Sequence, residues 1–440
     1  MKACKAVVIG LAILALGPMA VAEKVSIEFW HAATGALAAA LTEVVNGFNA
    51  SQDQYVVNAV YKGSYTETMS AAIAAFRAGQ APHIVQIFEV GTATMMAAEE
   101  AIYPVHQLMA DTGTPFDPDQ YIAPVKGYYS SADGKMVSMP FNSSTALLWY
   151  NKDAFRAAGL DPENPPRTWA EVRAAAKAIV AAGAAKMGLS TSWLTWIQYE
   201  QLAALHDVPF ATRANGFEGM DAELNLNHSL FVHHTQTLID MQAEGSFSYA
   251  GRDSAPDALF GSGEAAMLMA SSALRARVVR EAQFDWGVTY LPYYDEFIAE
   301  PKNSIIGGAS LWVMRRPRAS AAEYKGVAAF FSYLGQAATD AKWHMMTGYV
   351  PLTFAGYEAA KAQGYYEANP GADLAILQLA RPNPTENTRG LRLGNLPEIR
   401  VVVYEEVEKA LQGQQTAEQA MANVVRRGNA ILREFEAIYE

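Results

Sequence analysis

Two hydrophobic periods alternate between residues 25 and 88, and they constrain the fold more than any other feature of the chain. Short apolar runs typical of β-strands lie at Val25–Trp30, Tyr55–Tyr61 and His83–Phe88. Between them, apolar residues recur at helical spacing from Leu37 to Phe48 and from Thr66 to Ala78. Strands that alternate with helices favour a parallel sheet covered by helices, because parallel neighbours need long crossover connections. The sequence therefore predicts an α/β fold.

Polar and aromatic residues follow the ends of these three strands. Trp30 and His31 end the first strand, the segment 62–65 follows the second, and Glu89 follows the third. In open α/β sheets, ligands bind beside the carboxyl ends of the strands. A carboxylate such as Glu89, directly after an apolar run, needs partners. Two interpretations stay open: Glu89 caps the next helix, or it accepts hydrogen bonds from ligand hydroxyls beside the aromatic walls of Trp30 and Tyr65.

The size and charge of the chain narrow its class. With 440 residues, of which 51% are hydrophobic, it exceeds the usual size of one domain, so we expect two lobes. The formal net charge of -12 argues against a nucleic-acid partner, because such binding draws on clustered Lys and Arg. No repeat of fixed period occurs in the sequence, which argues against solenoids and propellers.

The first 22 residues predict a secretory signal. Lys2 and Lys5 precede an apolar run from residue 6 to 16, and Ala20-Val21-Ala22 forms a small-residue cleavage pattern before Glu23. The apolar run is too short for a membrane-spanning helix. We therefore expect cleavage near Glu23 and export to the periplasm. The only cysteine, Cys4, lies inside this signal, so the mature chain has no disulfide and no cysteine metal ligand.

Motifs of catalysis are absent from the sequence. There is no P-loop, no H-E-x-x-H and no G-x-S-x-G pattern, and the eight histidines are scattered. His233 and His234 are adjacent, which on a helix sends their side chains to different faces and disfavours a shared metal. We therefore predict no catalytic residue, no metal and no cofactor, and the chain is not expected to be an enzyme.

The middle of the chain predicts a passage into a second lobe. Residues 138–150 read S-M-P-F-N-S-S-T-A-L-L-W-Y and indicate an extended crossover whose hydroxyls and amides face a cleft. Thr168 and Glu171 form a capping box that begins an alanine-rich helix. Trp193 and Trp196 follow; one packs in the core while the other lines a site, and their spacing does not say which.

Small residues mark two further places of interest. Ser271 and Ser272 precede a helix predicted from residue 273 to 282. Serines there are ordinary N-caps, but the same position also offers free N–H groups to an anion. Gly307 and Gly308 lie in an apolar run, where a glycine pair indicates a tight turn or a close approach of the backbone to another group.

The stretch R-G-L-R-L-G-N-L-P-E-I-R-V-V-V, from Arg389 to Val403, sets three arginines against one carboxylate. Its last arginine, Arg400, precedes a β-branched run and is expected at the edge of a buried strand or at a helix start. Taken alone, the stretch favours a structural ion pair with Glu398, Glu405 or a more distant acid. The alternative is an anion-binding site.

Seven motifs in this order resemble the extracellular solute-binding proteins of ABC importers, and within them the binders of sn-glycerol-3-phosphate. The resemblance spans the mature chain. The motifs are F-W-H at Trp30, Y-K-G-S-Y ending at Tyr65, E-V-G-T-A-T-M-M from Glu89, P-F-N-S-S-T through Ser144, G-G-A-S-L-W-V-M from Gly307, T-G-Y-V-P around Tyr349, and G-L-R-L-G-N-L-P-E-I-R ending at Arg400.

The resemblance implies a type II periplasmic-binding fold, in which two α/β lobes close like a hinged trap on a ligand cleft. Each lobe is expected to be a mostly parallel sheet covered by helices. The expected division is a signal peptide at 1–22, a first lobe from 23–134 and 286–335, and a second lobe from 135–285 and 336–440.

The resemblance also implies the ligand contacts. Ser144, Ser271, Gly308, Tyr349 and Arg400 would hold the phosphate, and Tyr65, Glu89 and Trp193 would hold the glycerol end. The neighbours Ser272 and Gly307 remain alternatives to Ser271 and Gly308. One arginine fork with several hydroxyls and a backbone N–H suits a phosphate dianion, because charge-assisted hydrogen bonds are strong.

The function implied is capture of sn-glycerol-3-phosphate in the periplasm by a monomer that delivers it to two permease subunits with an ATPase pair. Three alternatives stay open. A glycerophosphodiester such as glycerophosphocholine needs more room than Trp193 leaves, and a sugar or oligosaccharide binder would not need Arg400 in its cleft. A secreted phosphoesterase is disfavoured, because the sequence offers neither a metal site nor a nucleophile.

Overall fold

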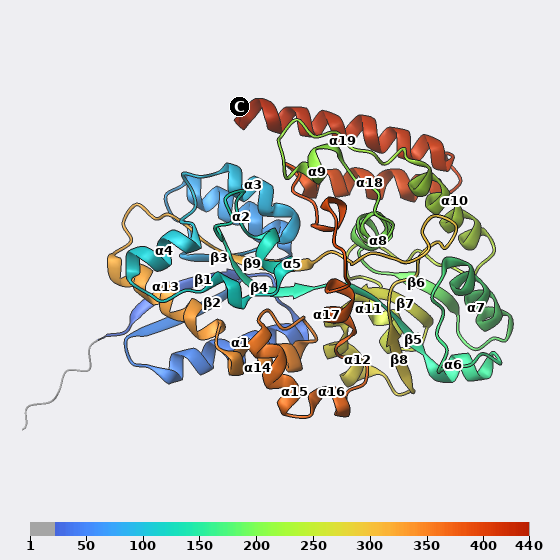
Figure 1. Cartoon of the computed structure of the whole chain (residues 1–440), viewed down its shortest axis with the longest axis horizontal. Helices are drawn as coiled ribbons and strands as arrows, with labels where there is room; N and C mark the ends of the chain where they lie inside the picture. Colours follow the sequence, from blue (N-terminus) through green and yellow to red (C-terminus); the bar gives the residue numbers. More distant parts are fainter. Residues whose placement is uncertain (1–22, 440) are drawn as a thin grey trace, which may run out of the picture.

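The computed structural model describes residues 23–439 and contains two β-sheets, each packed against helices (Figure 1). The signal predicted at 1–22 lies outside the described residues. Within residues 23–439, no helix has the length and apolar character that crossing a bilayer requires.

The first sheet has the strand order β2-β1-β3-β9-β4. The strands are β1 (Val25–His31), β2 (Tyr55–Tyr61), β3 (Ile84–Phe88), β4 (Met139–Ser144) and β9 (Gly307–Val313). Strand β1 pairs in parallel with β2 and β3, which confirms the parallel arrangement predicted from residues 25–88. Strand β9 returns to this sheet after the chain has built the second one, and it is antiparallel to both of its neighbours.

Helices cover both faces of the first sheet. Met69 and Ala72 of α2 (Tyr65–Arg77) share a core with Val85 and Ile87. Ile84, one residue along β3, instead joins the core on the opposite face, since successive side chains of a strand point to opposite sides. Helices that contribute to this second core include α1 (Gly35–Ser51), α4 (Val105–Thr112), α13 (Ala321–Leu334) and α14 (Ala337–Thr347).

The second sheet has the order β6-β7-β5-β8. Its strands are β5 (Ala146–Asn151), β6 (Met187–Thr191), β7 (Ala265–Ser271) and β8 (Trp286–Thr289). Strands β6 and β7 pair in parallel, and β5 is antiparallel to both β7 and β8, so β6, β7 and β8 run in one direction and β5 runs against them. Helix α7 (Trp169–Ala181) begins at the predicted capping box of Thr168 and Glu171. Helix α10 (Ser229–Ala243) also belongs to this side of the molecule (Figure 1).

The sheet membership of two strands differs from the expected lobe limits. Strand β4, expected in the second lobe, pairs with β9, and β8, expected in the first lobe, pairs with β5. The chain changes sheets at Thr145, inside one continuous extended run whose apolar pattern does not reveal where the pairing changes. The Thr145 hydroxyl donates to Ser304 Oγ at 2.8 Å, so the outgoing and returning segments touch. The remaining lobe limits stay predictions.

Two C-terminal helices, α18 (Leu396–Leu411) and α19 (Ala417–Tyr439), pack against each other along the top edge of the molecule in Figure 1. Helix α18 also contacts α10 and the short 3-10 turn η1 (Glu89–Gly91), which follows β3. It therefore reaches from the second lobe to the first. The side chain of Arg400 lies on this helix, not on a strand.

Shorter elements complete the described chain. They are α3 (Thr92–Ala97), η2 (Pro118–Gln120), α5 (Ala123–Tyr128), α6 (Lys152–Ala157), the π-helical segment η3 (Trp196–Glu200), α8 (Gln201–Leu205), α9 (Thr212–Gly216), α11 (Asp257–Gly261), η4 (Ser272–Leu274), α12 (Arg275–Glu281), α15 (Phe354–Ala362), α16 (Tyr365–Ala368), α17 (Leu374–Leu379) and η5 (Glu386–Thr388).

A buried histidine ties α8 to the segment that follows β8. His206 Nδ1 lies 2.8 Å from the Leu202 carbonyl oxygen, and its Nε2 accepts the Tyr294 N–H at 2.9 Å. Only the neutral ring, with the proton on Nδ1, satisfies both contacts. Burial lowers the pKa of His206 to about 4. The unfolded chain therefore binds a proton more readily than the folded protein.

We expect His206 to make stability depend on pH. Its contribution is complete above the unfolded pKa of about 6.5 and is lost as the pH falls toward 4, with a slope of at most about 1.4 kcal/mol per pH unit for one proton. Urea unfolding of the wild-type protein and of His206→Gln at several values between pH 4.5 and 7.5 measures this slope. The variant should show a shallower pH dependence; equal slopes would contradict the assignment.

Candidate ligand-binding site

One cavity of about 470 Å³ is lined by residues from both lobes. It brings together all eight side chains or backbone positions that the sequence predicted for the ligand. They are Tyr65, Glu89, Ser144, Trp193, Ser271, Gly308, Tyr349 and Arg400. Ser272 and Gly307, the neighbours that the sequence left as alternatives, are not among the residues that line it.

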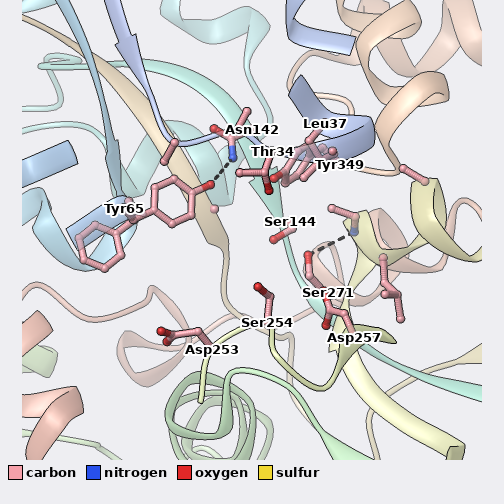
Figure 2. A pocket seen from close by; sticks show the side chains of 18 of the residues that line it. Thr34, Leu37, Tyr65, Asn142, Ser144, Asp253, Ser254, Asp257, Ser271 and Tyr349 are labelled. Carbon is pink, nitrogen blue, oxygen red and sulfur yellow. Dashed lines mark hydrogen bonds between the residues drawn. The ribbon is translucent and has the colours of Figure 1, made fainter. Parts of the chain in front are cut away.

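Three hydroxyl groups meet where the chain passes between the sheets. Ser144 ends β4, Ser271 ends β7, and Tyr349 follows α14. Figure 2 shows Ser144 between Tyr349 on one side and Ser271 on the other. The Ser271 hydroxyl accepts the Ala273 N–H at 3.2 Å, so it is an N-cap as well as a lining residue. Its own proton stays available to a ligand.

Two glycines allow these groups to come close. Gly308 has a φ of +93°, and a Cβ there would lie 1.9 Å from the Asn142 carbonyl oxygen. Gly348 has a φ of +78°, and its Cβ would lie 2.7 Å from the Ser272 carbonyl oxygen. Both positions require glycine, because the left-handed backbone and the close approach exclude a side chain. The turn at Gly348 thereby sets Tyr349 beside the serine segment.

Aromatic stacking orients the two tyrosines of the cavity. The ring of Tyr65 stacks on Phe88 with centroids 5.5 Å apart, and Tyr349 stacks on Trp343 at 5.9 Å. Asn142 Nδ2 donates to Tyr65 Oη at 2.9 Å, as Figure 2 shows. Burial raises the pKa of both tyrosine hydroxyls above its usual value. They therefore remain protonated and can donate hydrogen bonds.

The start of α1 adds backbone donors to the same wall. Residues 34–37 line the cavity. Among the described residues, no side chain caps this helix and no acid lies in its first turn. The first N–H groups of a helix lack partners within the helix and lie at the positive end of its dipole. This wall therefore attracts negative charge.

A buried ion cluster lies at another part of the cavity wall. Arg400 donates from Nε and Nη2 to the two carboxylate oxygens of Glu200, both at 2.7 Å, and from Nη2 to Glu89 Oε1 at 2.7 Å. Their exposed fractions are 7% for Arg400, 3% for Glu200 and 6% for Glu89. With both acids ionised, the cluster carries a net charge of -1.

The buried environment shifts the pKa values of Glu89 and Arg400. Burial raises the pKa of Glu89; the charge of Arg400 opposes that rise, and the charge of Glu200 adds to it. For Arg400, burial lowers the pKa, but the charges of Glu200 and Glu89 outweigh it and raise the pKa. The guanidinium thus stays charged between its two acids.

The structure answers two questions that the sequence left open. Arg400 has ion-pair partners, but they are Glu89 and Glu200; Glu405 instead pairs with Arg427. The Glu89 side chain accepts from Arg400, and neither η1 nor α3 has a side-chain cap among the described residues. Glu200 was missed, because nothing in the sequence connects two residues so far apart along the chain.

Trp193 is held over the cavity in an uncommon backbone conformation. Its φ is 47°, and its N–H donates to the carbonyl oxygen of Asp253, whose own φ is 50°, at 2.7 Å. A bulky residue with positive φ is strained and persists only where its surroundings hold it. Trp196 also lines the cavity, although it is only 4% exposed. Both tryptophans therefore belong to the site.

Sequence reasoning missed other lining residues. Asn142 lines the cavity and lies in the motif P-F-N-S-S-T, two residues before Ser144, so its position in that motif could have predicted it. Asp253 and Asp257 precede and begin α11, where no pattern distinguishes them from surface acids. Asp257 accepts a hydrogen bond from Ser192 Oγ at 2.5 Å, and burial raises its pKa to about 6.

These features define a two-lobed binding protein with a polar cleft between its lobes. Within residues 23–439, no three His, Cys, Asp or Glu side chains gather in a way that could hold a metal ion. Residues 43–372 match the family model described as bacterial extracellular solute-binding protein. The chain belongs to this family.

Similar proteins support the same classification. The chain is 47% identical over 406 residues to the sn-glycerol-3-phosphate-binding periplasmic protein UgpB of Rhizobium meliloti (strain 1021), covering 92% of this chain and 93% of that protein. It is 45% identical to the protein of that name from Brucella abortus (strain 2308), with 97% of each chain covered. A crystal structure of UgpB from Mycobacterium tuberculosis in complex with glycerophosphocholine has the same fold, with a TM-score of 0.79, 20% identity, and coverage of 93% and 98%.

We predict that Arg400→Ala destabilises the ligand-free protein by about 3–5 kcal/mol, because it leaves two buried carboxylates unpaired. Urea unfolding without ligand measures this loss. Arg252→Ala is a matched control: Arg252 pairs with Glu408, but its side chain is 40% exposed, so the loss should stay below about 1 kcal/mol. Equal small losses in both variants would contradict a buried ion cluster.

Proposed function

We propose that this chain is the solute-binding component of an ABC importer and captures sn-glycerol-3-phosphate in the periplasm. The observation that carries the proposal is the gathering of eight predicted contact residues around one cavity. Full-length similarity to proteins named as binders of this ligand supports it. The chain acts as a monomer, is exported by the signal at residues 1–22, and delivers its ligand to two permease subunits with an ATPase pair.

The phosphate group binds at the wall that combines hydroxyl donors with backbone N–H donors. Ser144, Ser271 and Tyr349 offer hydroxyl protons, and the start of α1 offers N–H groups. Gly308 lets the backbone approach closely. Hydrogen bonds from these groups to an ionised phosphate are charge-assisted and are each worth about 1.5–3 kcal/mol.

The glycerol end binds beside Tyr65, Glu89 and Trp193. The ion pairs of Arg400 lead us to assign it to this end, although the sequence resemblance assigned it to the phosphate. Two carboxylates already neutralise its charge, so the cluster would repel a dianion at close range. Ligand hydroxyls fit better, because they donate to Glu89 and accept from the guanidinium.

A glycerophosphodiester is the second candidate. The carboxylates of Asp253 and Asp257 line the same cavity and would suit a cationic substituent on the phosphate. The crystal structure of similar fold contains glycerophosphocholine, which supports this candidate. We propose the simple ester as the principal ligand, because the similar full-length proteins are named as binders of sn-glycerol-3-phosphate. A sugar ligand is disfavoured because it offers no anion to the hydroxyl donors of Ser144, Ser271 and Tyr349. A phosphoesterase activity is disfavoured because the sequence offers neither a metal site nor a nucleophile.

Calorimetry of the mature protein with sn-glycerol-3-phosphate, glycerophosphocholine, maltose and inorganic phosphate tests the proposal. We expect the first ligand to bind most tightly and, at 100 times its Kd, to add about 2.7 kcal/mol to the free energy of unfolding. A protein that binds maltose but neither glycerol phosphate would overturn the proposed function.

Ser144→Ala should weaken the binding of sn-glycerol-3-phosphate by about tenfold or more, the loss of one hydrogen bond to a charged group. The matched control is Ser143→Ala, because Ser143 is adjacent in β4 and fully buried but does not line the cavity. Titration calorimetry compares the two variants. Equal affinities would show that Ser144 does not contact the ligand.

A further inference from the structure

We propose that Glu200 is the residue that orients the ligand: it holds Arg400 in place and makes this end of the cavity accept hydroxyl groups and reject a second anionic group. The proposal rests on the proposed function and adds a specificity-determining residue to it. Glu200 does not line the cavity, so it acts through Arg400 as a positioning residue.

The geometry of the pair fixes the guanidinium. Both carboxylate oxygens of Glu200 accept from Arg400, at Nε and at Nη2. A bidentate pair sets the plane as well as the position of the guanidinium. Arg400 lines the cavity. Its hydrogen bonds to the two glutamates use Nε and Nη2, so Nη1 remains for a ligand oxygen.

The surroundings of Glu200 hold it rigidly. It is the last residue of the π-helical segment Trp196–Glu200. Side chains of this segment are anchored: Gln198 donates to Thr191 Oγ1 at 2.8 Å, and Tyr199 Oη lies 2.9 Å from Thr235 Oγ1. π-Helical turns inside helices are rare and occur often at functional sites. This one presents a carboxylate to a helix that comes from much later in the chain.

The charge count decides what the site accepts. A pair of Arg400 with Glu89 alone would be neutral. In such a pair, Arg400 could exchange the Glu89 carboxylate for a carboxylate or phosphate of the ligand. Glu200 adds a second buried negative charge, so an anionic group that approaches Arg400 meets a net charge of -1. Repulsion of this kind is strong where water is excluded. Hydroxyl groups are not repelled, and Glu89 can accept hydrogen bonds from them.

This arrangement gives the cavity two unlike ends. The start of α1 and the three hydroxyls attract the phosphate, and the cluster around Arg400 excludes it. A ligand with one phosphate and two hydroxyls thus enters in one orientation. Discrimination of this type comes from an unfavourable contact with the wrong group as much as from a favourable contact with the right one.

A comparison of two ligands tests the proposal. sn-Glycerol-3-phosphate and the 3-phosphoglycerate of matched configuration at C2 differ only at C1, where a hydroxymethyl group is replaced by a carboxylate. Calorimetry gives the ratio of the Kd for 3-phosphoglycerate to the Kd for sn-glycerol-3-phosphate. In Glu200→Gln, which keeps the shape and removes the charge, we expect this ratio to fall at least about tenfold.

Two further variants separate charge from structure. Glu200→Asp keeps the negative charge and should keep the ratio close to that of the wild-type protein. Glu406→Gln is the matched control: Glu406 is 2% exposed and pairs with Lys409 and Arg427, but it does not line the cavity or contact Arg400. Glu406→Gln should lower stability and leave the ratio unchanged. If Glu200→Gln does not fold, Glu89→Gln removes one negative charge from the same cluster. The ratio of the two Kd values is then measured in that variant and should also fall.

The outcomes distinguish this proposal from the proposed function. Wild-type binding of sn-glycerol-3-phosphate, with a lower ratio in Glu200→Gln, supports both. Wild-type binding with an unchanged ratio in the charge-removing variant, or equal losses of affinity for both ligands, assigns Glu200 a structural role and overturns this proposal alone. A wild-type protein that binds no glycerol phosphate overturns the proposed function and this proposal with it.

Discussion

The buried cluster of Arg400, Glu89 and Glu200 is the interaction on which the arrangement of this protein depends. Moving three charged groups out of water costs several kcal/mol each, and their attraction repays this only when the geometry is good. Here every contact is 2.7 Å, and Glu200 is bound through both oxygens. Glu89 follows β3 of the first sheet, whereas Arg400 lies on α18, which packs against α10 of the second lobe. The cluster therefore links the first lobe to the second and also sets the charge of this part of the cavity wall.

The opposite wall of the cavity depends on backbone constraints rather than on charge. The chain passes once from β4 to β5 and returns before β9, and Ser144 and Ser271 lie where these passages meet. Gly308 and Gly348 adopt backbone conformations with positive φ and leave no room for a Cβ. A serine hydroxyl, a tyrosine hydroxyl and a helix start thus converge without an acid in the first turn of that helix. Such a wall is preorganised for an anion, because its donors are in place before the ligand arrives.

Local patterns predicted the local structure well. The period-2 and helical runs between residues 25 and 88 gave β1, α1, β2, α2 and β3 close to their observed bounds, and the Thr168 capping box marked the start of α7. The pairing of strands that lie far apart along the chain was harder to predict from the sequence. The antiparallel placement of β9, and the exchange of β4 and β8 relative to the expected lobe limits, depend on where an extended run changes partner. An apolar run looks the same in both sheets, so sequence pattern alone does not decide it.

The candidate site shows the same limit in chemical form. The eight residues predicted from the motifs all line one cavity, including Tyr349 and Arg400. The role of Arg400, however, depends on its ion pair with Glu200, which lies in none of the seven motifs. The sequence around Arg400 favoured an ion pair for this residue, whereas the motif resemblance favoured a contact with the ligand. Both are compatible, because a guanidinium has more donors than two carboxylates use. In the binding mode that we propose, such a neutralised arginine acts as a rigid hydrogen-bond donor between two acceptors rather than as the phosphate receptor. A cleft that places such a donor opposite a helix start can tell the two ends of a small phosphate ester apart.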